Sequence, residues 1–417
     1  MQRCRDPEFL LNPAPQSLTI RGGATTFKRQ VEMKTNLNRR EFLQGVSAAA
    51  AGFCLAPSGL WAKAAPAAPV AVARCTTYGR ELMTTLASMF DQLGGLGPLV
   101  NGKTVAMKIN VTGSPPNFFH KLPVGETYWV HPQVVGSVIH LMGKAGARRI
   151  RLVESPTGWR FPSFEEFLAT ANWNTGDLAS AASGVEFENT NYPGPTGKYS
   201  RFWVPGGGLL FRAYDMSRAY EDCDVFVSLA KLKEHTTAGV TLTMKNCFGN
   251  TPTTIYGDGV GADEPSSVPQ GARLGTLHKG KRQPPKSSLA EIDPTSPREP
   301  GYRVPRVVAD LVAARPIHLA IIDGVETGAG GEGPWNNNFR TVRPGLLIAG
   351  ANCVNTDAVA TALMGFDPMA DRGTAPFESC DSTLKLAEQL GVGTRDLTRI
   401  EVRGLPIEKV RFDIRRA

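Results

Sequence analysis

The sequence has few cysteines, and none of them is arranged for binding a metal. Seven occur in 417 residues, and no two form a Cys-x-x-Cys pair. This excludes a zinc ribbon and a ferredoxin-type iron–sulfur cluster. Five of the seven lie beyond residue 64, and an odd number cannot all form disulfides. We interpret these five as small buried hydrophobic residues: Cys75, Cys223, Cys247, Cys353 and Cys380.

The sequence also lacks a long hydrophobic run and a basic stripe. Residues 46–60, an Ala-rich apolar segment, are shorter than the about 20 residues that a membrane-spanning helix needs. The formal charge of +8 reflects 46 Lys/Arg and 38 Asp/Glu, of which residues 1–64 hold nine and four. Subtraction leaves 37 basic and 34 acidic residues in the rest of the chain. We therefore expect neither a stable membrane span nor a nucleic-acid partner.

The segment before residue 65 has the pattern of a twin-arginine export signal. Paired arginines at 39–40 precede Phe-Leu, the apolar segment, and an Ala-Lys-Ala cleavage pattern at 62–64. Residues ahead of Met33 resemble no signal, so we expect translation to start at Met33. The pattern predicts that the twin-arginine translocase exports the folded chain to the periplasm. Proteins exported by this route often carry a cofactor inserted beforehand, so we expect a metal or a nucleotide-derived cofactor, whose identity stays open.

Residues 65–417 alternate between strand and helix patterns. Expected strands lie at 103–109, 149–154, 224–230, 317–323 and 345–349, and expected helices at 132–145, 164–172, 304–314, 355–364 and 384–390. The alternation predicts an α/β fold with a mainly parallel, helix-covered sheet. Two lobes around a cleft, divided near residue 220, are an open alternative. Residues 251–301 are rich in Gly, Pro, Ser and Lys, which predicts a long irregular insertion.

The densest group of polar residues follows the third expected strand. Lys231, Lys233 and His235 come directly after it, and Lys245 and Asn246 follow nearby. Lysines at a strand's carboxyl end can bind a carboxylate or a phosphate, and histidine transfers protons near neutral pH. We predict that His235, Lys233 and Lys245 are catalytic and that Lys231 and Asn246 bind substrate. The alternative is a solvated lysine loop. The stretch between His235 and Lys245 fits a strand or a helix, and helix is favoured.

Polar residues also end other expected strands. Lys108 and Asn110 close the first strand and Glu154 closes the second, so we predict that all three bind substrate. His278, in the insertion, is predicted to be a mobile substrate ligand, with a solvated loop histidine as the alternative.

Two aspartates are candidate metal ligands. Asp323 closes the fourth expected strand, and Asp357 lies near the start of a helix. Together with His235 they would offer oxygen and nitrogen ligands. For Asp357 the alternative is a charge that stabilises the helix N-terminus.

The polar motifs resemble those of the family called domain of unknown function 362. The resemblance is carried by VFVSLAKLKEH at 225–235, GVT at 239–241 and KNCFG at 245–249. Lys-Ile-Asn at 108–110 and Asn-Thr-Asp-Ala at 355–358 follow the order of that family. The resemblance implies membership in an exported branch that lacks the ferredoxin module. It implies no reaction.

A weaker resemblance connects His235 and Lys245 to the nickel-pincer lactate racemases. In that family a histidine transfers protons and a lysine, similarly spaced, holds the pincer nucleotide. The resemblance implies an acid–base role for His235 and a cofactor anchor at Lys245, as in a racemase or epimerase. The glycine pairs around that family's lysine are replaced here by Thr-Leu-Thr-Met and Cys-Phe-Gly.

The motifs together predict an exported enzyme that acts on a small anionic substrate in a cleft lined by lysine and histidine. Lys108, Lys231 and Lys233 would hold the anion while His235 moves a proton. The alternatives are a non-catalytic periplasmic protein that binds an anion or a metal, and a relative of the nickel-pincer racemases.

Overall fold

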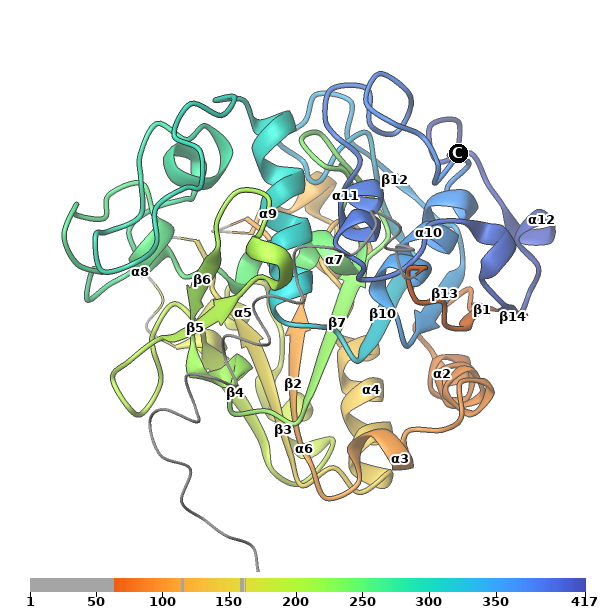
Figure 1. The fold of residues 1–417 in the computed structure, drawn as a ribbon. Coiled ribbons are helices and arrows are strands. Elements are labelled where there is room, and N and C mark those ends of the chain that lie inside the picture. The colour runs from red at the N-terminus through yellow and green to blue at the C-terminus, as the bar shows by residue number, and fades with distance from the viewer. Residues whose placement is uncertain (1–63, 114–115, 158–160, 162) are drawn as a thin grey trace, which may run out of the picture. The chain divides into compact units, whose positions relative to one another are not determined.

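A computed structural model describes residues 64–113, 116–157, 161 and 163–417 (Figure 1). The described residues from 64 on belong to one compact unit, so the structure does not divide near residue 220. The predicted export signal and Met33 lie outside the described residues. Among the helices that the structure describes, none is long and apolar enough to cross a membrane.

The core of the fold is an eight-stranded sheet in the order β14-β1-β13-β10-β7-β2-β3-β4 (Figure 1). Its strands are β1 (Val70–Arg74), β2 (Thr104–Ile109), β3 (Arg149–Glu154), β4 (Val185–Asn189), β7 (Val225–Lys231), β10 (Leu319–Gly324), β13 (Leu346–Gly350) and β14 (Val402–Gly404). β13 pairs antiparallel with both of its neighbours, and all other neighbouring pairs are parallel. The predicted mainly parallel α/β fold is confirmed.

Helices cover both faces of this sheet. In β7, Val227 and Leu229 pack into one hydrophobic cluster, and Phe226 packs into the other. A strand buried on both faces reads as a continuous apolar run, which is why β7 could be recognised from the sequence. The first cluster includes α2 (Arg80–Gln92) and α4 (Pro132–Lys144); the second includes α9 (Pro300–Ala314), α10 (Cys353–Leu363) and α11 (Thr383–Gln389).

Local signals set the ends of these helices. α4 begins with Pro132 at its first position, and the His131 side chain accepts a hydrogen bond from the Gln133 N–H. Gly146 follows α4 with φ +90°, a conformation that glycine adopts without strain. α9 begins at Pro300, four residues before the expected start, because a proline at the first turn favours initiation.

The remaining elements are short and lie mostly between the main ones. They are α3 (Gly97–Val100), α5 (Phe164–Ala169), α6 (Thr175–Ser180), β5 (Ser200–Trp203), β6 (Ala213–Met216), β8 (Glu234–His235), β9 (Gly239–Val240), α7 (Leu242–Asn246), α8 (Thr253–Tyr256), β11 (Thr327–Ala329), β12 (Arg340–Val342) and α12 (Ile407–Val410). The insertion at 251–301 contains α8 and one π-helical turn, η6 (Leu274–His278), and is otherwise irregular.

The strand order indicates where a ligand site is expected. From β2 the sheet continues to β3 and β4 on one side, whereas β7 and β10 lie on the other side. In open α/β sheets, ligands bind beyond the carboxyl ends of the strands where the order reverses. That point lies between β2 and β7, where Lys108 and Lys231 are located.

Candidate functional site

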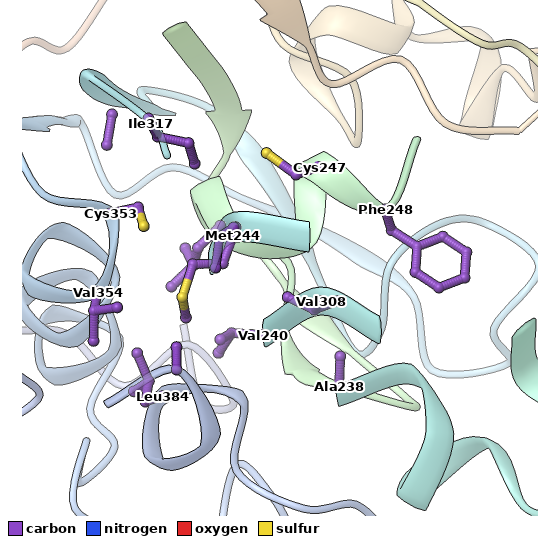
Figure 2. Close-up of a cluster of buried hydrophobic side chains, with 14 of the residues drawn as sticks. Ala238, Val240, Met244, Cys247, Phe248, Val308, Ile317, Cys353, Val354 and Leu384 are labelled. Carbon is purple, nitrogen blue, oxygen red and sulfur yellow. The ribbon is translucent and has the colours of Figure 1, made fainter. Parts of the chain in front are cut away.

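Helix α7 carries two of the predicted site residues and is held in place by α10. Asp357 of α10 accepts hydrogen bonds from the backbone N–H groups of Thr243 and Met244, both at 2.9 Å. Met244 packs among hydrophobic side chains that include Val354 and Leu384 (Figure 2). The stretch before Lys245 is thus both a short strand, β9, and a helix, which explains its ambiguous pattern.

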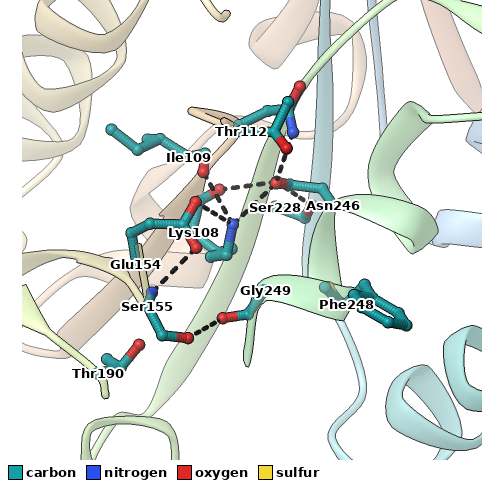
Figure 3. Close-up of polar contacts among 12 residues, drawn as sticks. Lys108, Ile109, Thr112, Glu154, Ser155, Thr190, Ser228, Asn246, Phe248 and Gly249 are labelled. Atoms are coloured by element: carbon teal, nitrogen blue, oxygen red, sulfur yellow. Dashed lines mark hydrogen bonds and ion pairs between the residues drawn. The ribbon is translucent and has the colours of Figure 1, made fainter. Parts of the chain in front are cut away.

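Asn246, at the end of α7, joins strands β2 and β7. Its Nδ2 donates to the carbonyls of Lys108 (3.1 Å) and Leu229 (3.2 Å), and to Ser228 Oγ (3.0 Å) (Figure 3). Its Oδ1 accepts from Lys108 Nζ at 3.0 Å. The amide therefore sits at the point where the strand order reverses and orders both strand ends.

Lys108 is buried and its hydrogen bonds are complete. Its Nζ donates to Glu154 Oε2 (2.7 Å), the Ile109 carbonyl (2.9 Å) and Asn246 Oδ1, which uses all three ammonium hydrogens (Figure 3). Burial raises the pKa of Glu154, and Lys108 opposes that rise. A Cβ atom at Gly249 would lie 2.5 Å from Glu154 Oε1, so only glycine fits beside this ion pair.

Lys231 forms a second closed ion pair on the α4 side of the sheet. Its Nζ lies 2.9 Å from Asp323 Oδ2 and also donates to the Tyr78 hydroxyl and the Gly125 carbonyl. The ring of Tyr78 stacks on His131 with 3.6 Å between centroids. Both Lys231 and Asp323 are fully buried, and neither lines a cavity described here. The structure thus gives Lys231 a structural role in place of the predicted substrate contact.

Lys233 is likewise enclosed. Its Nζ donates to the carbonyls of Tyr128 (2.6 Å) and Glu332 (3.0 Å) and lies 5.5 Å from the Tyr128 ring centroid. The side chain is fully buried, which lowers its pKa well below the ordinary value. It does not reach the cleft, so the predicted catalytic role of Lys233 gains no geometric support.

Two adjoining cavities form a cleft beyond the ends of β2 and β3. The inner chamber, about 80 Å³, is polar and is lined by Lys108, Asn110, Glu154, Ser155, Asn246 and Gly249, among others. The outer chamber, about 520 Å³, is lined by His235, Leu274, His278, Glu332 and Trp335, among others. Lys245, Phe248 and Arg273 line both chambers. Seven of the predicted site residues therefore line the cleft, and Lys245 lines both of its chambers.

Lys245 and Arg273 are the cations that the cleft leaves without a carboxylate. Lys245 Nζ lies 4.4 Å from the Phe248 ring centroid, and no described residue accepts a hydrogen bond from it. Burial, opposed by Glu332 and reinforced by Arg273 and Lys108, lowers the pKa of Lys245 to about 8. Arg273 donates to the carbonyls of Thr251 and Ser155, and burial lowers its pKa to about 10.

The outer chamber places a neutral histidine near an ionised glutamate. The Thr237 N–H donates to His235 Nδ1 at 3.2 Å, so the neutral ring carries its proton on Nε2. Burial and Lys245 lower the pKa of His235 well below its ordinary value. Burial alone would raise the pKa of Glu332, but hydrogen bonds from the Trp335 Nε1–H and the Thr236 N–H lower it.

His278 and Asn110 complete the polar lining. His278 lies in η6 with its ring 5.0 Å from that of Phe248, and burial lowers its pKa to about 4. It thus lines the outer chamber as a neutral side chain. Asn110 Oδ1, in the inner chamber, is buried without a hydrogen-bond partner among the described residues. This atom is available to a ligand that donates a hydrogen bond.

The structure does not bring the predicted metal ligands together. Asp323 accepts from Lys231 and the His131 N–H, whereas Asp357 accepts from the start of α7. In the part of the chain that the structure describes, no group of three or more His, Cys, Asp or Glu side chains could hold a metal ion. In this structure Asp323 instead pairs with a lysine, and Asp357 accepts hydrogen bonds at the start of a helix.

A larger cavity of about 700 Å³ lies elsewhere, next to α10 and α12. Its lining includes Phe366, Leu397, Ile407 and Arg411. None of the predicted site residues lines it, and it is remote in sequence from the ends of β2 and β7. The polar cleft around Lys245 is therefore the better candidate site.

Comparison with known proteins identifies the family. The model described as Domain of unknown function (DUF362) matches residues 105–362, more than half of the chain. The chain belongs to this family. A thylakoid-associated protein of Synechocystis sp. is 25% identical over 306 residues, which cover 72% of this chain and 75% of the relative. No solved structure matches. The family match contains α7 and both chambers' strand ends, and it confirms the family resemblance.

Sequence reasoning assigned no site role to several residues of the cleft, among them Arg273, Glu332 and Trp335. Arg273 lies in the irregular insertion, where no periodicity indicates which side chains are buried. Glu332 and Trp335 belong to the Gly-rich loop after β11, which offered only its composition as a signal. The five cysteines beyond residue 64 are all buried and free, as interpreted from the sequence.

Proposed function

We propose that this protein is an enzyme that binds a small anionic substrate in the cleft and moves a proton with His235. The observation that carries the proposal is the pair of cations, Lys245 and Arg273, that the described residues leave without a carboxylate. A cation held away from water without a counter-ion destabilises the fold, more strongly for the buried Arg273 than for the half-buried Lys245. An anion between the two chambers would offset that destabilisation through charged hydrogen bonds.

His235 supplies the acid–base group of this proposal. In the empty cleft its pKa is low, because burial and Lys245 disfavour the imidazolium. An anion bound beside it would stabilise the imidazolium, which raises the pKa toward the working range of a general base. Substrate binding itself would thus make His235 competent to accept a proton, and Glu332 would stabilise the resulting charge.

Binding can be tested before the substrate is known. We expect isothermal titration of the full chain with a panel of small 2-hydroxy and 2-oxo carboxylates to detect binding. Arg273→Gln should weaken it roughly 10- to 100-fold, because a hydrogen bond to a charged group contributes about 1.5–3 kcal/mol. Lys281→Gln, which removes an exposed cation from the same insertion, is the matched control and should bind like the wild type.

Catalysis has its own readout. In D₂O, a proton-transferring enzyme replaces the hydrogen on C2 of a 2-hydroxy acid, or on C3 of a 2-oxo acid, with deuterium, which proton NMR detects. His235→Gln should abolish this exchange while binding persists. Binding without exchange for every member of the panel would contradict the enzyme proposal and favour a non-catalytic anion-binding protein.

Export through the twin-arginine translocase to the periplasm is part of the proposal. It rests on the paired arginines, the apolar segment and the Ala-Lys-Ala pattern ahead of residue 65. N-terminal sequencing of protein recovered from the host's periplasm should give a start near Ala65. Elemental analysis and the intact mass of the same sample test for a metal or a nucleotide-derived group on Lys245, as the nickel-pincer alternative requires.

A further inference from the structure

The uncommitted amine of Lys245 is the least explained group in the cleft. Lys108, Lys231 and Lys233 each donate to carbonyl or carboxylate oxygens, whereas the described residues offer Lys245 Nζ only the face of Phe248. A contact with an aromatic face positions the amine and leaves its hydrogen bonds available for a ligand. It faces both chambers, so a ligand that extends from one to the other must pass it.

We propose that Lys245 condenses with the carbonyl group of a 2-oxo acid to form an imine. This inference rests on the proposed function and names its substrate class. A 2-oxo acid has a carbonyl group directly beside a carboxylate, and the cleft has an amine and a second cation in the lining of the same two chambers. Arg273, which lines both chambers with Lys245, would hold the carboxylate.

The sizes of the two chambers indicate which part of a 2-oxo acid each one would hold. The inner chamber of about 80 Å³ has room only for a group as small as a carboxylate. The outer chamber of about 520 Å³ has the side chains of Leu274 and Trp335 in its wall. An apolar or aromatic substituent on the far side of the carbonyl would lie there. The cleft therefore favours a 2-oxo acid with such a substituent over pyruvate.

The reaction balances without any further reagent. The lone pair of neutral Lys245 Nζ attacks the carbonyl carbon, and the carbonyl oxygen takes a proton as the C–N bond forms. The first proton on that oxygen comes from the nitrogen, and the resulting carbinolamine N–H loses its one remaining proton as the oxygen leaves as water, so the two amine protons end on the water and a C=N bond remains. One water is released per imine, and nothing is oxidised or reduced. His235 can relay a proton in this step: the neutral ring accepts one from the nitrogen and, as the imidazolium, returns it to the departing oxygen.

The electrostatics of the cleft favour this step. A lysine must be neutral to attack, and burial together with Arg273 and Lys108 lowers the pKa of Lys245 to about 8. Below that pH the neutral fraction changes about tenfold per pH unit. The rate of imine formation should follow this fraction and level off above pH 8.

The test is reductive trapping on the full chain. Protein is incubated with phenylpyruvate or pyruvate, reduced with sodium borohydride, digested and analysed by mass spectrometry. We expect a secondary-amine adduct on the peptide that contains Lys245, formed faster with phenylpyruvate than with pyruvate. Lys245→Arg keeps the charge and should lose the adduct. Lys144→Arg, at an exposed position, should keep it.

A parallel titration separates this inference from the proposed function. Phenyllactate has the carboxylate and the ring but no ketone, so it binds without forming an imine. If phenyllactate binds while no adduct forms on Lys245, or adducts spread equally over exposed lysines, the imine is disproved and the anion site stands. If neither phenyllactate nor any 2-oxo acid binds, the proposed function fails together with the imine.

Discussion

Two groups of cations lie at the carboxyl edge of the same sheet and differ in whether their hydrogen bonds are complete. Lys231 is surrounded by Asp323, Tyr78 and the Gly125 carbonyl and is sealed from solvent. Lys245, fourteen residues later, is half-buried and has only an aromatic face beside it. The difference indicates that the first lysine stabilises the fold and the second serves a ligand. Neighbouring lysines of one motif can thus have opposite roles.

The largest expected effect is the loss of stability on breaking the buried Lys231–Asp323 pair. Lys231→Met leaves Asp323 buried without its counter-ion, which should lower the free energy of unfolding by about 3–5 kcal/mol. Urea denaturation measures this change. Lys144→Met is the exposed control and should stay within about 0.5 kcal/mol of the wild type. A small loss for Lys231→Met would remove the distinction between the two groups.

Gly249→Ala tests the wall between the Lys108–Glu154 pair and the inner chamber. The added methyl group would lie 2.5 Å from Glu154 Oε1 and 3.0 Å from Lys108 Nζ. Because both side chains are fixed by their pairing, we expect a loss of about 1–3 kcal/mol in unfolding free energy. Binding of small carboxylates should also fall. Gly261→Ala, where the added methyl meets nothing, is the control. Unchanged binding in Gly249→Ala would argue against the inner chamber as the anion site.

Asp357→Asn tests the positioning of α7 through pH. Burial, opposed by hydrogen bonds from Thr243 and Met244, raises the pKa of Asp357 from 3.8 to about 7. The folded state therefore binds more protons than the unfolded state between those values, and this contribution to stability is lost as pH rises from about 4 to 7. The variant should lack this pH dependence and lose about 1–2 kcal/mol at pH 5. Parallel pH profiles of wild type and variant would contradict the assignment.

Lys245→Met should have the smallest effect on stability, and of opposite sign. The lowered pKa means that the unfolded state binds more protons between about pH 8 and the ordinary value of 10.5. The penalty is therefore full below pH 8 and disappears above 10.5. Removing the amine should raise stability at pH 7 by roughly 1 kcal/mol, since the side chain is only half-buried. A destabilised variant would indicate that Lys245 has a partner like that of Lys231.

Much of the fold follows from local patterns. The apolar runs of β2, β3 and β7 and the helical spacing in α4 are contained within a few turns of chain, so their positions were predicted to within one or two residues. Parallel strands end at one edge, so Lys108 and Glu154 were expected at that edge, but their meeting with Asn246 depends on the strand order, which the sequence does not give. β1, β4 and β14 were missed, since all three are short strands of three to five residues.

The sequence could not predict which lysines have all their ammonium hydrogen bonds satisfied within the fold. Tyr78 and Gly125 complete the hydrogen bonds of Lys231 from segments more than 100 residues away, and no local pattern marks them as its partners. Arg273 and Glu332 reach the cleft from irregular segments, where burial is set by tertiary packing. The sequence therefore indicates at which edge of the sheet the site lies. Only the three-dimensional structure shows that Lys231 is paired within the fold and that Lys245 is not.

The most direct test of the central claim is the proton uptake that accompanies anion binding. Phenyllactate is titrated calorimetrically at pH 8 in buffers of different ionisation enthalpy. If Lys245 is the cation that binds the anion, the bound anion raises the pKa of Lys245, and the wild type should take up about half a proton per ligand. Lys245→Met should bind more weakly and take up none. Equal proton uptake in both proteins, or none in the wild type, would contradict the account.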